Sequence, residues 1–149
     1  MHGVWGFQYK RQFEWLKETR QFLYRKISLA QQKTVLEPGC STALLTEEIS
    51  KRIPGIAVGL DRNLHALLAA KKRANSLLLV CGDVYTLPFK KETFDAVIFQ
   101  FFLLWLSDPI AALQEIKRIV CSPGSITTIA EPDYGGRIDF PQDINYGVS

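Results

Sequence analysis

The sequence of 149 residues has few of the residues that build metal sites and disulfide frameworks. It has two histidines and three cysteines, Cys40, Cys81 and Cys121, with no CxxC pair and no His/Cys cluster. An odd number of widely separated cysteines is typical of reduced thiols in a cytoplasmic protein rather than of disulfide bonds. We therefore expect a cytoplasmic protein without a metal site.

Long hydrophobic runs are also missing. The longest, residues 96–106, contains Gln100 and is shorter than the roughly 20 residues that a membrane-spanning helix needs. No basic segment followed by an apolar one opens the chain, so we expect no secretion signal and no membrane partner.

Strong net charge is the third absence, because the formal charge is only +3. Basic residues gather at 10–26 and at 71–73, where they are typical of solvated helix faces. A nucleic-acid groove is the alternative interpretation, but aromatic residues do not alternate with these basic ones as single-strand binding requires. The sequence argues against nucleic acid as a partner.

Apolar residues make up 47% of the chain, enough for one core, and the length suits a single domain over residues 1–149. Short apolar runs without polar alternation predict buried strands, and the segments between them have helical spacing. The predicted strands are 34–37, 56–61, 77–81, 94–100 and 125–130, and the predicted helices are 7–27, 42–52, 64–74 and 109–120. This alternation predicts an α/β fold with a doubly wound, mostly parallel sheet, preceded by a helical segment at 1–30 and followed by an irregular tail at 132–149.

Acidic residues stand at the ends of four predicted strands: Glu37, Asp61, Asp83 and Glu131. In a doubly wound sheet, ligands bind beyond the carboxyl ends of the strands, where these residues would meet. A desolvated carboxylate without a partner costs free energy, so we expect each to have one.

The first strand leads into a turn of small residues, and Asp61 follows 22 positions after Gly39. An acidic residue at that spacing accepts hydrogen bonds from ribose hydroxyls, which predicts a nucleoside ligand. Leu44 occupies the third small position of a dinucleotide-binding turn, and Glu37 would repel a pyrophosphate. Both features disfavour a nicotinamide-dependent oxidoreductase and favour a nucleoside that carries positive charge.

Simpler roles remain open for each acid. Asp61 would also suit the cap of the following helix, Asp83 a turn after Gly82, and Glu37 the rim of the site. Cys40 is more typical of a small buried residue than of a nucleophile.

Five ordered segments resemble the class I S-adenosylmethionine-dependent methyltransferases. "VLEPGCSTA" resembles the E/D-x-G-x-G-x-G loop of that family, "GLDRN" its ribose-binding strand end, and "GDVYTLPF" its adenine-side motif. "FDAVIFQFFLLWLSDP" and "CSPGSITTIAEPD" resemble its fourth and fifth strand segments. The resemblance implies a Rossmann-like methyltransferase fold, S-adenosylmethionine as cofactor, and methyl transfer as the activity.

The resemblance also implies cofactor-binding positions. Glu37 and Gly39 would face the methionine end of the cofactor, Asp61 the ribose, and Asp83 with the Val84 backbone the adenine. The remaining predicted contacts flank these positions: Cys40, Ser41, Arg62, Gln100 and Phe101. Alignment of donor and acceptor supplies much of the rate in such chemistry, so the sequence requires no general base and identifies no catalytic residue.

Two departures from the family pattern matter. Ser41 and Ala43 replace the second and third glycines of the loop. Only 18 residues follow Glu131, too few for the helix and the terminal strands with which the family sheet usually continues. The sheet therefore appears shortened after its fifth strand, and we expect an exposed edge that a second copy or a partner chain covers. A cofactor-binding module that is non-catalytic, or is completed by a partner, is the alternative function.

The acceptor is the least determined feature. The segment after the fourth strand lacks the Asn/Asp-Pro-Pro-aromatic motif of amino-directed nucleic-acid methyltransferases, which favours a small-molecule acceptor. Phe101 and Trp105 suit either the core or an apolar substrate wall. Glu131, Asp133 and Tyr134 would either orient a nucleophile or lie at the rim.

Overall fold

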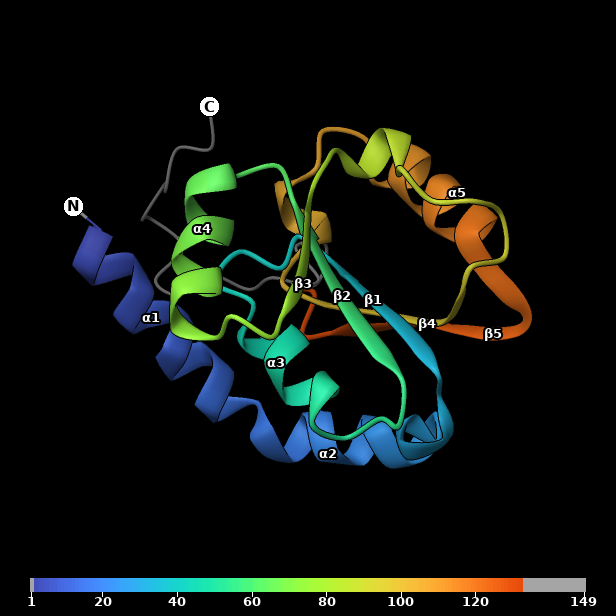
Figure 1. The fold of residues 1–149 in the computed structure, drawn as a ribbon, viewed down its shortest axis with the longest axis horizontal. Coiled ribbons are helices and arrows are strands. Elements are labelled where there is room, and N and C mark those ends of the chain that lie inside the picture. The colour runs from blue at the N-terminus through green and yellow to red at the C-terminus, as the bar shows by residue number, and fades with distance from the viewer. Residues whose placement is uncertain (1, 133–149) are drawn as a thin grey trace, which may run out of the picture.

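The computed structural model describes residues 2–132, with side chains from residue 8 onwards. Five parallel strands form one sheet in the order β3-β2-β1-β4-β5, with helices on both faces (Figure 1). The strands are β1 (Thr34–Pro38), β2 (Ile56–Asp61), β3 (Leu78–Cys81), β4 (Phe94–Gln100) and β5 (Val120–Ile129). The α-helices are α1 (His2–Trp15), α2 (Lys17–Lys26), α3 (Leu44–Ser50), α4 (Leu64–Arg73) and α5 (Pro109–Ile119), and the 3-10 helices are η1 (Leu29–Gln31), η2 (Val84–Thr86) and η3 (Leu103–Trp105). The predicted doubly wound fold is confirmed.

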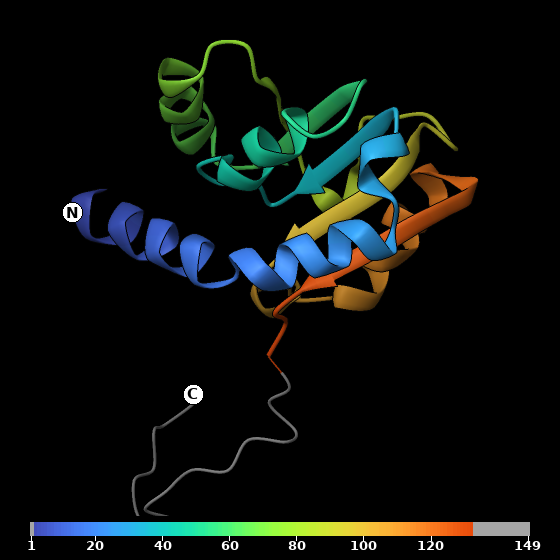
Figure 2. The same ribbon diagram turned by 90° about the horizontal axis from the view of Figure 1, so that it is seen from below.

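The sheet buries side chains on both faces because successive strand residues point in opposite directions. In β1, Leu36 packs with the apolar side of α5, whereas its neighbour Val35 packs with α2 and α3. A third apolar cluster lies between α4 and the turn after β1. Figure 2 shows α1 and α2 following one another along the sheet, on the side opposite α5. Two-sided burial explains why the strand sequences are continuously apolar.

Side-chain caps start two of the α-helices. The Asn63 side chain accepts a hydrogen bond from the Ala66 amide at 3.1 Å at the start of α4, just after β2, and Asp108 accepts one from the Ala111 amide at 2.9 Å at the start of α5. These oxygens satisfy backbone donors that the first helical turn leaves unpaired.

Two predicted boundaries were wrong. The predicted helix at 7–27 is two helices, α1 and α2, separated at Leu16. The strand predicted at 125–130 begins earlier, at Val120, and its register on β4 shifts between the pairs Phe94–Val120 and Ala96–Ser125. The intervening residues form an irregularity of the bulge type, which bends an edge strand without ending it.

β5 and β3 are the edge strands of the sheet. Over residues 2–132, no strand pairs with the outer side of β5, and Ile126 on that strand is 42% exposed. The tail predicted at 132–149 lies outside the described residues from position 133 onwards, and so do Asp133 and Tyr134.

Candidate functional site

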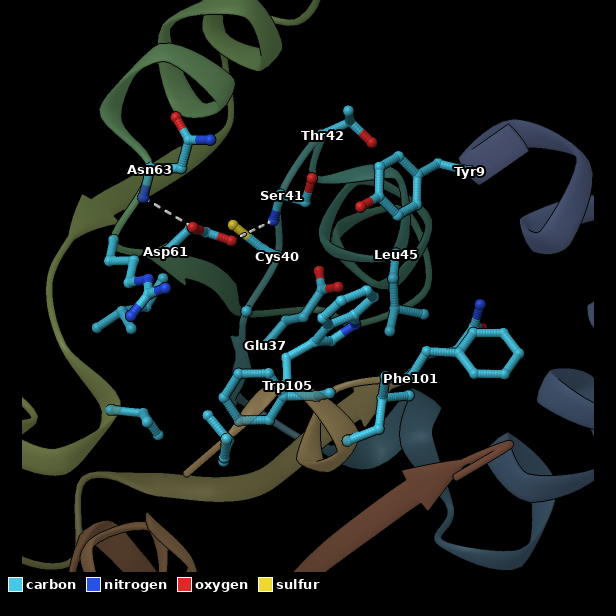
Figure 3. Close-up of a pocket in the computed structure, with 18 of the residues that line it drawn as sticks. Tyr9, Glu37, Cys40, Ser41, Thr42, Leu45, Asp61, Asn63, Phe101 and Trp105 are labelled. Carbon is cyan, nitrogen blue, oxygen red and sulfur yellow. Dashed lines mark hydrogen bonds between the residues drawn. The ribbon is translucent and has the colours of Figure 1, made fainter. Parts of the chain in front are cut away.

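A cavity of about 880 Å³ opens at the carboxyl ends of the strands. The turn after β1 and the ends of β2, β3 and β4 line one part of it, and α1 and η3 line another (Figure 3). All ten residues predicted to contact a cofactor line this cavity: Glu37, Gly39, Cys40, Ser41, Asp61, Arg62, Asp83, Val84, Gln100 and Phe101. The sheet therefore brings the predicted residues together, while their contacts with a cofactor remain a prediction.

The turn after β1 takes left-handed backbone conformations at its three small residues. The φ angles are +69° at Gly39, +46° at Ser41 and +55° at Ala43. A Cβ at Gly39 would lie 2.2 Å from the Phe102 ring, so only glycine fits there. Ser41 and Ala43 adopt a conformation that costs a non-glycine residue about 1–2 kcal/mol. The backbone of the turn keeps the left-handed conformations that glycine favours, although Ser41 and Ala43 stand where the family pattern has glycine.

Asp61 ends β2 and holds the turn in place. One carboxylate oxygen accepts a hydrogen bond from the Ser41 amide at 2.7 Å, and the other accepts one from the Asn63 amide at 2.8 Å (Figure 3). A carboxylate can accept about four hydrogen bonds, so each oxygen retains capacity for a ligand donor. The residue that caps α4 is Asn63 rather than Asp61, so the predicted helix-capping role of Asp61 is wrong. Its two bonds support the turn and are geometrically compatible with the predicted ribose role.

Glu37 is buried, with 6% of its surface exposed, yet its side chain borders the cavity. The Thr46 hydroxyl donates a hydrogen bond to its carboxylate. Burial raises the pKa of Glu37 to about 8 against the lowering effect of the Thr46 hydrogen bond, and the charge of Asp61 raises the pKa further. A cation in the cavity would restore the ionised form of Glu37 because it supplies the missing counter-charge.

Cys40 and Gly59 show why β1, β2 and α3 can approach closely. The Cys40 thiol is buried, and burial raises its pKa, as expected of an inert packing residue. A Cβ on Gly59 would lie 2.7 Å from the Thr46 hydroxyl and 2.8 Å from the Cys40 sulfur. Gly59 thus leaves room for the pair formed by Thr46 and Glu37.

Asp83 begins η2, where its carboxylate accepts a hydrogen bond from the Tyr85 amide at 2.9 Å. Val84 beside it is buried. The Tyr85 hydroxyl in turn accepts a hydrogen bond from the Asp108 amide at 3.0 Å, which connects this loop to the start of α5. Asp83 has the turn role predicted for it, and its exposed carboxylate also borders the cavity.

Gln100 and Phe101 form the β4 end of the cavity. The Gln100 side-chain oxygen is buried and has no hydrogen-bond partner among the described residues. Phe101 has a φ of +49°, which is uncommon for a bulky residue and is often found at functional sites. A buried acceptor without a donor is costly, so this end of the cavity fits a ligand that brings a hydrogen-bond donor.

Glu131 has a structural role at the other side of this loop. Its two carboxylate oxygens accept hydrogen bonds from the Phe102 amide at 2.7 Å and the Leu103 amide at 3.1 Å. Glu131 does not line the cavity. The structure supports neither of the two roles predicted for Glu131. Its carboxylate holds the residues after β4 in place, so it neither orients a nucleophile nor lies at the rim of the cavity.

Sequence reasoning missed the contribution of α1. Tyr9, Gln12 and Phe13 line the cavity, and Tyr9 projects toward it from the helix (Figure 3). These three residues belong to no recognised sequence motif. Only the packing of α1 beside the turn after β1 shows that they face the same cavity. The sequence left two alternatives for Trp105, the core and an apolar substrate wall. Trp105 is 68% exposed and lines the cavity.

Metal and membrane features are absent from the described part of the chain. No group of three or more His, Cys, Asp or Glu side chains could hold a metal ion within residues 2–132. Among those residues there is also no helix that has the length and apolar character to cross a membrane.

Comparisons with known proteins agree with the fold and the motifs. A family model described as a methyltransferase domain matches residues 36–128. A demethylmenaquinone methyltransferase of Corynebacterium kroppenstedtii is 37% identical over 117 residues, covering 78% of this chain and 48% of the relative. An uncharacterized methyltransferase of Schizosaccharomyces pombe is 29% identical over 126 residues, covering 76% of this chain and 45% of the relative. The chain thus spans about half the length of the curated relatives it matches.

A solved structure shares the fold. It is a chain of the Haloferax volcanii complex between the Trm112 methyltransferase activator and a methyltransferase candidate. The TM-score is 0.71 at 21% identity, and the match covers 83% of this chain and 55% of the other.

Proposed function

Because this chain belongs to the class I S-adenosylmethionine-dependent methyltransferases, we propose that it binds S-adenosylmethionine in the cavity and transfers the methyl group to a small molecule in the cytoplasm. The observation that carries the proposal is the pair formed by Glu37 and Asp61. One is a buried carboxyl with a raised pKa and no ion pair among the described residues, the other is a fixed carboxylate with free acceptor capacity, and both border one open cavity.

Each part of the cavity suits one part of this cofactor. Glu37 would attract the cationic methionine end, where the ammonium and sulfonium lie. Asp61 would accept from the ribose hydroxyls while it keeps its bonds to the Ser41 and Asn63 amides. Asp83 and the Val84 backbone would contact the adenine. When bound, the cofactor supplies a methyl group on a positively charged sulfur, so the chain's own residues need only bind, orient and exclude water.

Two observations support a small-molecule acceptor. The bacterial relatives are named demethylmenaquinone methyltransferases, and this name indicates a small-molecule acceptor for them. The residues after β4 also lack the motif of amino-directed nucleic-acid methyltransferases.

Isothermal titration of the folded chain with S-adenosylmethionine and S-adenosylhomocysteine tests the proposal. We expect saturable binding of both, and a methylated product with a panel of small acceptors. Absence of binding to either ligand by a sample with an intact circular dichroism spectrum would refute the cofactor assignment.

The exposed edge of β5 favours a second candidate function. A cofactor-binding module completed by a second copy or a partner chain would cover Ile126 and the free backbone groups of that strand. Light scattering after size-exclusion chromatography distinguishes a monomer from a self-associated form. Turnover by a monomer would count against this candidate.

A further inference from the structure

The cavity has an aromatic half to which only one of the predicted cofactor contacts, Phe101, belongs. Tyr9 and Phe13 of α1 and Phe101 and Trp105 beyond β4 all line it. We call these four residues the aromatic wall. In Figure 3, Tyr9 and Phe101 lie on the opposite side of Glu37 from Asp61, and Trp105 lies beside Glu37. The cavity therefore has an acidic half and an aromatic half that meet at Glu37.

Two separate parts of the chain build this wall, and each is anchored by hydrogen bonds. Arg20 donates to the Phe13 carbonyl and its guanidinium lies 3.6 Å from the centre of the Phe13 ring, which fixes α1. Glu131 fixes the Phe102 and Leu103 amides beside Phe101 and Trp105. Because hydrogen bonds hold both segments of the aromatic wall in place, the wall can bind a ligand without reorganisation.

Trp105 is unusual for its exposure. At 68% exposed, its indole contributes little to the core, yet it borders the cavity. Large aromatic side chains with one open face bind flat rings by offset stacking or edge contacts. The aromatic wall therefore favours a flat, apolar ligand over a flexible polar one.

The charges around the cavity restrict the ligand further. Glu37, Asp61 and Asp83 border it, and Arg62 is the one cationic side chain among the described residues that line it. The carboxylates of Asp61 and Asp83, joined by Glu37 once a bound cation ionises it, would repel an anionic ligand. Phosphorylated and carboxylated acceptors are therefore disfavoured.

The unpartnered oxygen of Gln100 adds a polar requirement. It is a buried acceptor at the β4 end, in the same segment as Phe101. A hydroxyl on the ligand would donate to it and remove the cost of leaving it unpaired.

From these contacts we infer that the aromatic wall binds a flat, uncharged aromatic acceptor that carries a phenolic hydroxyl. This inference rests on the proposed function, because it assigns the acceptor half of the same site.

The test is calorimetric titration of the S-adenosylhomocysteine-saturated chain with 2-naphthol and with 2-naphthoate, which share a ring system but differ in charge. We expect saturable binding of 2-naphthol and at least about tenfold weaker binding of 2-naphthoate. Trp105→Ala should weaken 2-naphthol binding about fivefold or more, and by a clearly larger factor than it weakens S-adenosylhomocysteine binding. Trp15→Ala is the matched control, because Trp15 is 81% exposed and does not line the cavity.

The outcomes separate the two proposals. If S-adenosylhomocysteine binds but 2-naphthol does not, or if 2-naphthoate binds equally well, the acceptor inference is wrong and the proposed function stands. An equal loss in the Trp15 and Trp105 variants would also overturn the inference. If S-adenosylhomocysteine fails to bind while 2-naphthol binds with the expected dependence on Trp105, the wall is an apolar site and the proposed function fails.

Discussion

At the scale of single residues, Glu37 is the most informative side chain of the site. Desolvation dominates its environment and raises its pKa to about 8, so it is largely protonated at neutral pH in the absence of a ligand. The Thr46 hydroxyl can donate to the carboxyl oxygen in either protonation state. A cationic ligand therefore changes the charge of Glu37 when it binds.

We predict that S-adenosylmethionine binding strengthens as pH rises from 6 to 8. The bound cation favours ionised Glu37 and lowers its pKa, so binding below about pH 8 releases a proton and is opposed by acid. The dissociation constant should fall by up to about tenfold per pH unit in this window and level off above it.

Titration calorimetry at several pH values measures this dependence, and Glu37→Gln is the control. The variant keeps an oxygen that accepts from Thr46 but cannot ionise at this position. The pH dependence of its binding therefore reflects only the ionisation of the ligand. Identical profiles for the two proteins would show that Glu37 does not bind the cationic end.

Asp61 has two functions that a substitution can separate. Asp61→Asn keeps one oxygen acceptor but loses the charge and part of the support for the Ser41 amide. We predict about tenfold or greater loss in S-adenosylhomocysteine affinity, because a hydrogen bond to a charged group contributes about 1.5–3 kcal/mol. Asp95→Asn is a matched control, since Asp95 accepts from the Lys33 and Thr34 amides at the opposite end of the sheet. An equal loss of affinity in both variants would indicate general damage to the fold.

At the scale of elements, α2 is attached to α3 by a buried ion pair. Arg20 is 1% exposed, and its guanidinium lies 3.0 Å from the Glu48 carboxylate. Buried ion pairs stabilise little overall, but removal of one partner leaves an uncompensated charge.

Glu48→Leu should therefore lower the free energy of unfolding by about 3–5 kcal/mol in urea titrations. The double variant Arg20→Met/Glu48→Leu should recover most of that loss, because neither charge remains buried. A double variant as unstable as the sum of its single changes would contradict this account of the pair.

The loop after β4 depends on Glu131 for its position. Glu131→Ala removes the acceptor for two backbone amides and should lower the free energy of unfolding by about 1–3 kcal/mol. If the loop presents the acceptor, the same variant should raise KM for the acceptor, with little change in cofactor affinity.

Steady-state kinetics with separate variation of cofactor and acceptor checks this, and Glu131→Gln should restore part of the effect because its amide oxygen can accept one hydrogen bond. A rise of equal size in both KM values would point to a general loss of structure.

At the scale of the whole molecule, the sequence predicted the architecture well because its signals were local. Continuous apolar strands, the small residues from Gly39 to Ala43, and acids at strand ends each reflect a constraint of the parallel sheet itself. The break at Leu16 was not predicted, and the irregularity near Ser122 was not predictable because strand register determines it. The aromatic wall combines α1 with the β4 loop, and no sequence motif connects elements so far apart.

The edge at β5 bears on which experiment tests the account. The described residues include all ten that we predict to contact the cofactor, whereas the outer side of β5 has no paired strand among them. We therefore expect the described fold to bind the cofactor, and binding is a more direct test of the account than turnover.

A crystal structure of the chain soaked with S-adenosylhomocysteine tests the central claim most directly. We predict that the ligand fills the cavity with its ribose hydroxyls on Asp61, its adenine beside Asp83 and Val84, and its amino acid end toward Glu37. Clear density for the ligand at another location, or a cavity without ligand at saturating concentration, would contradict the account.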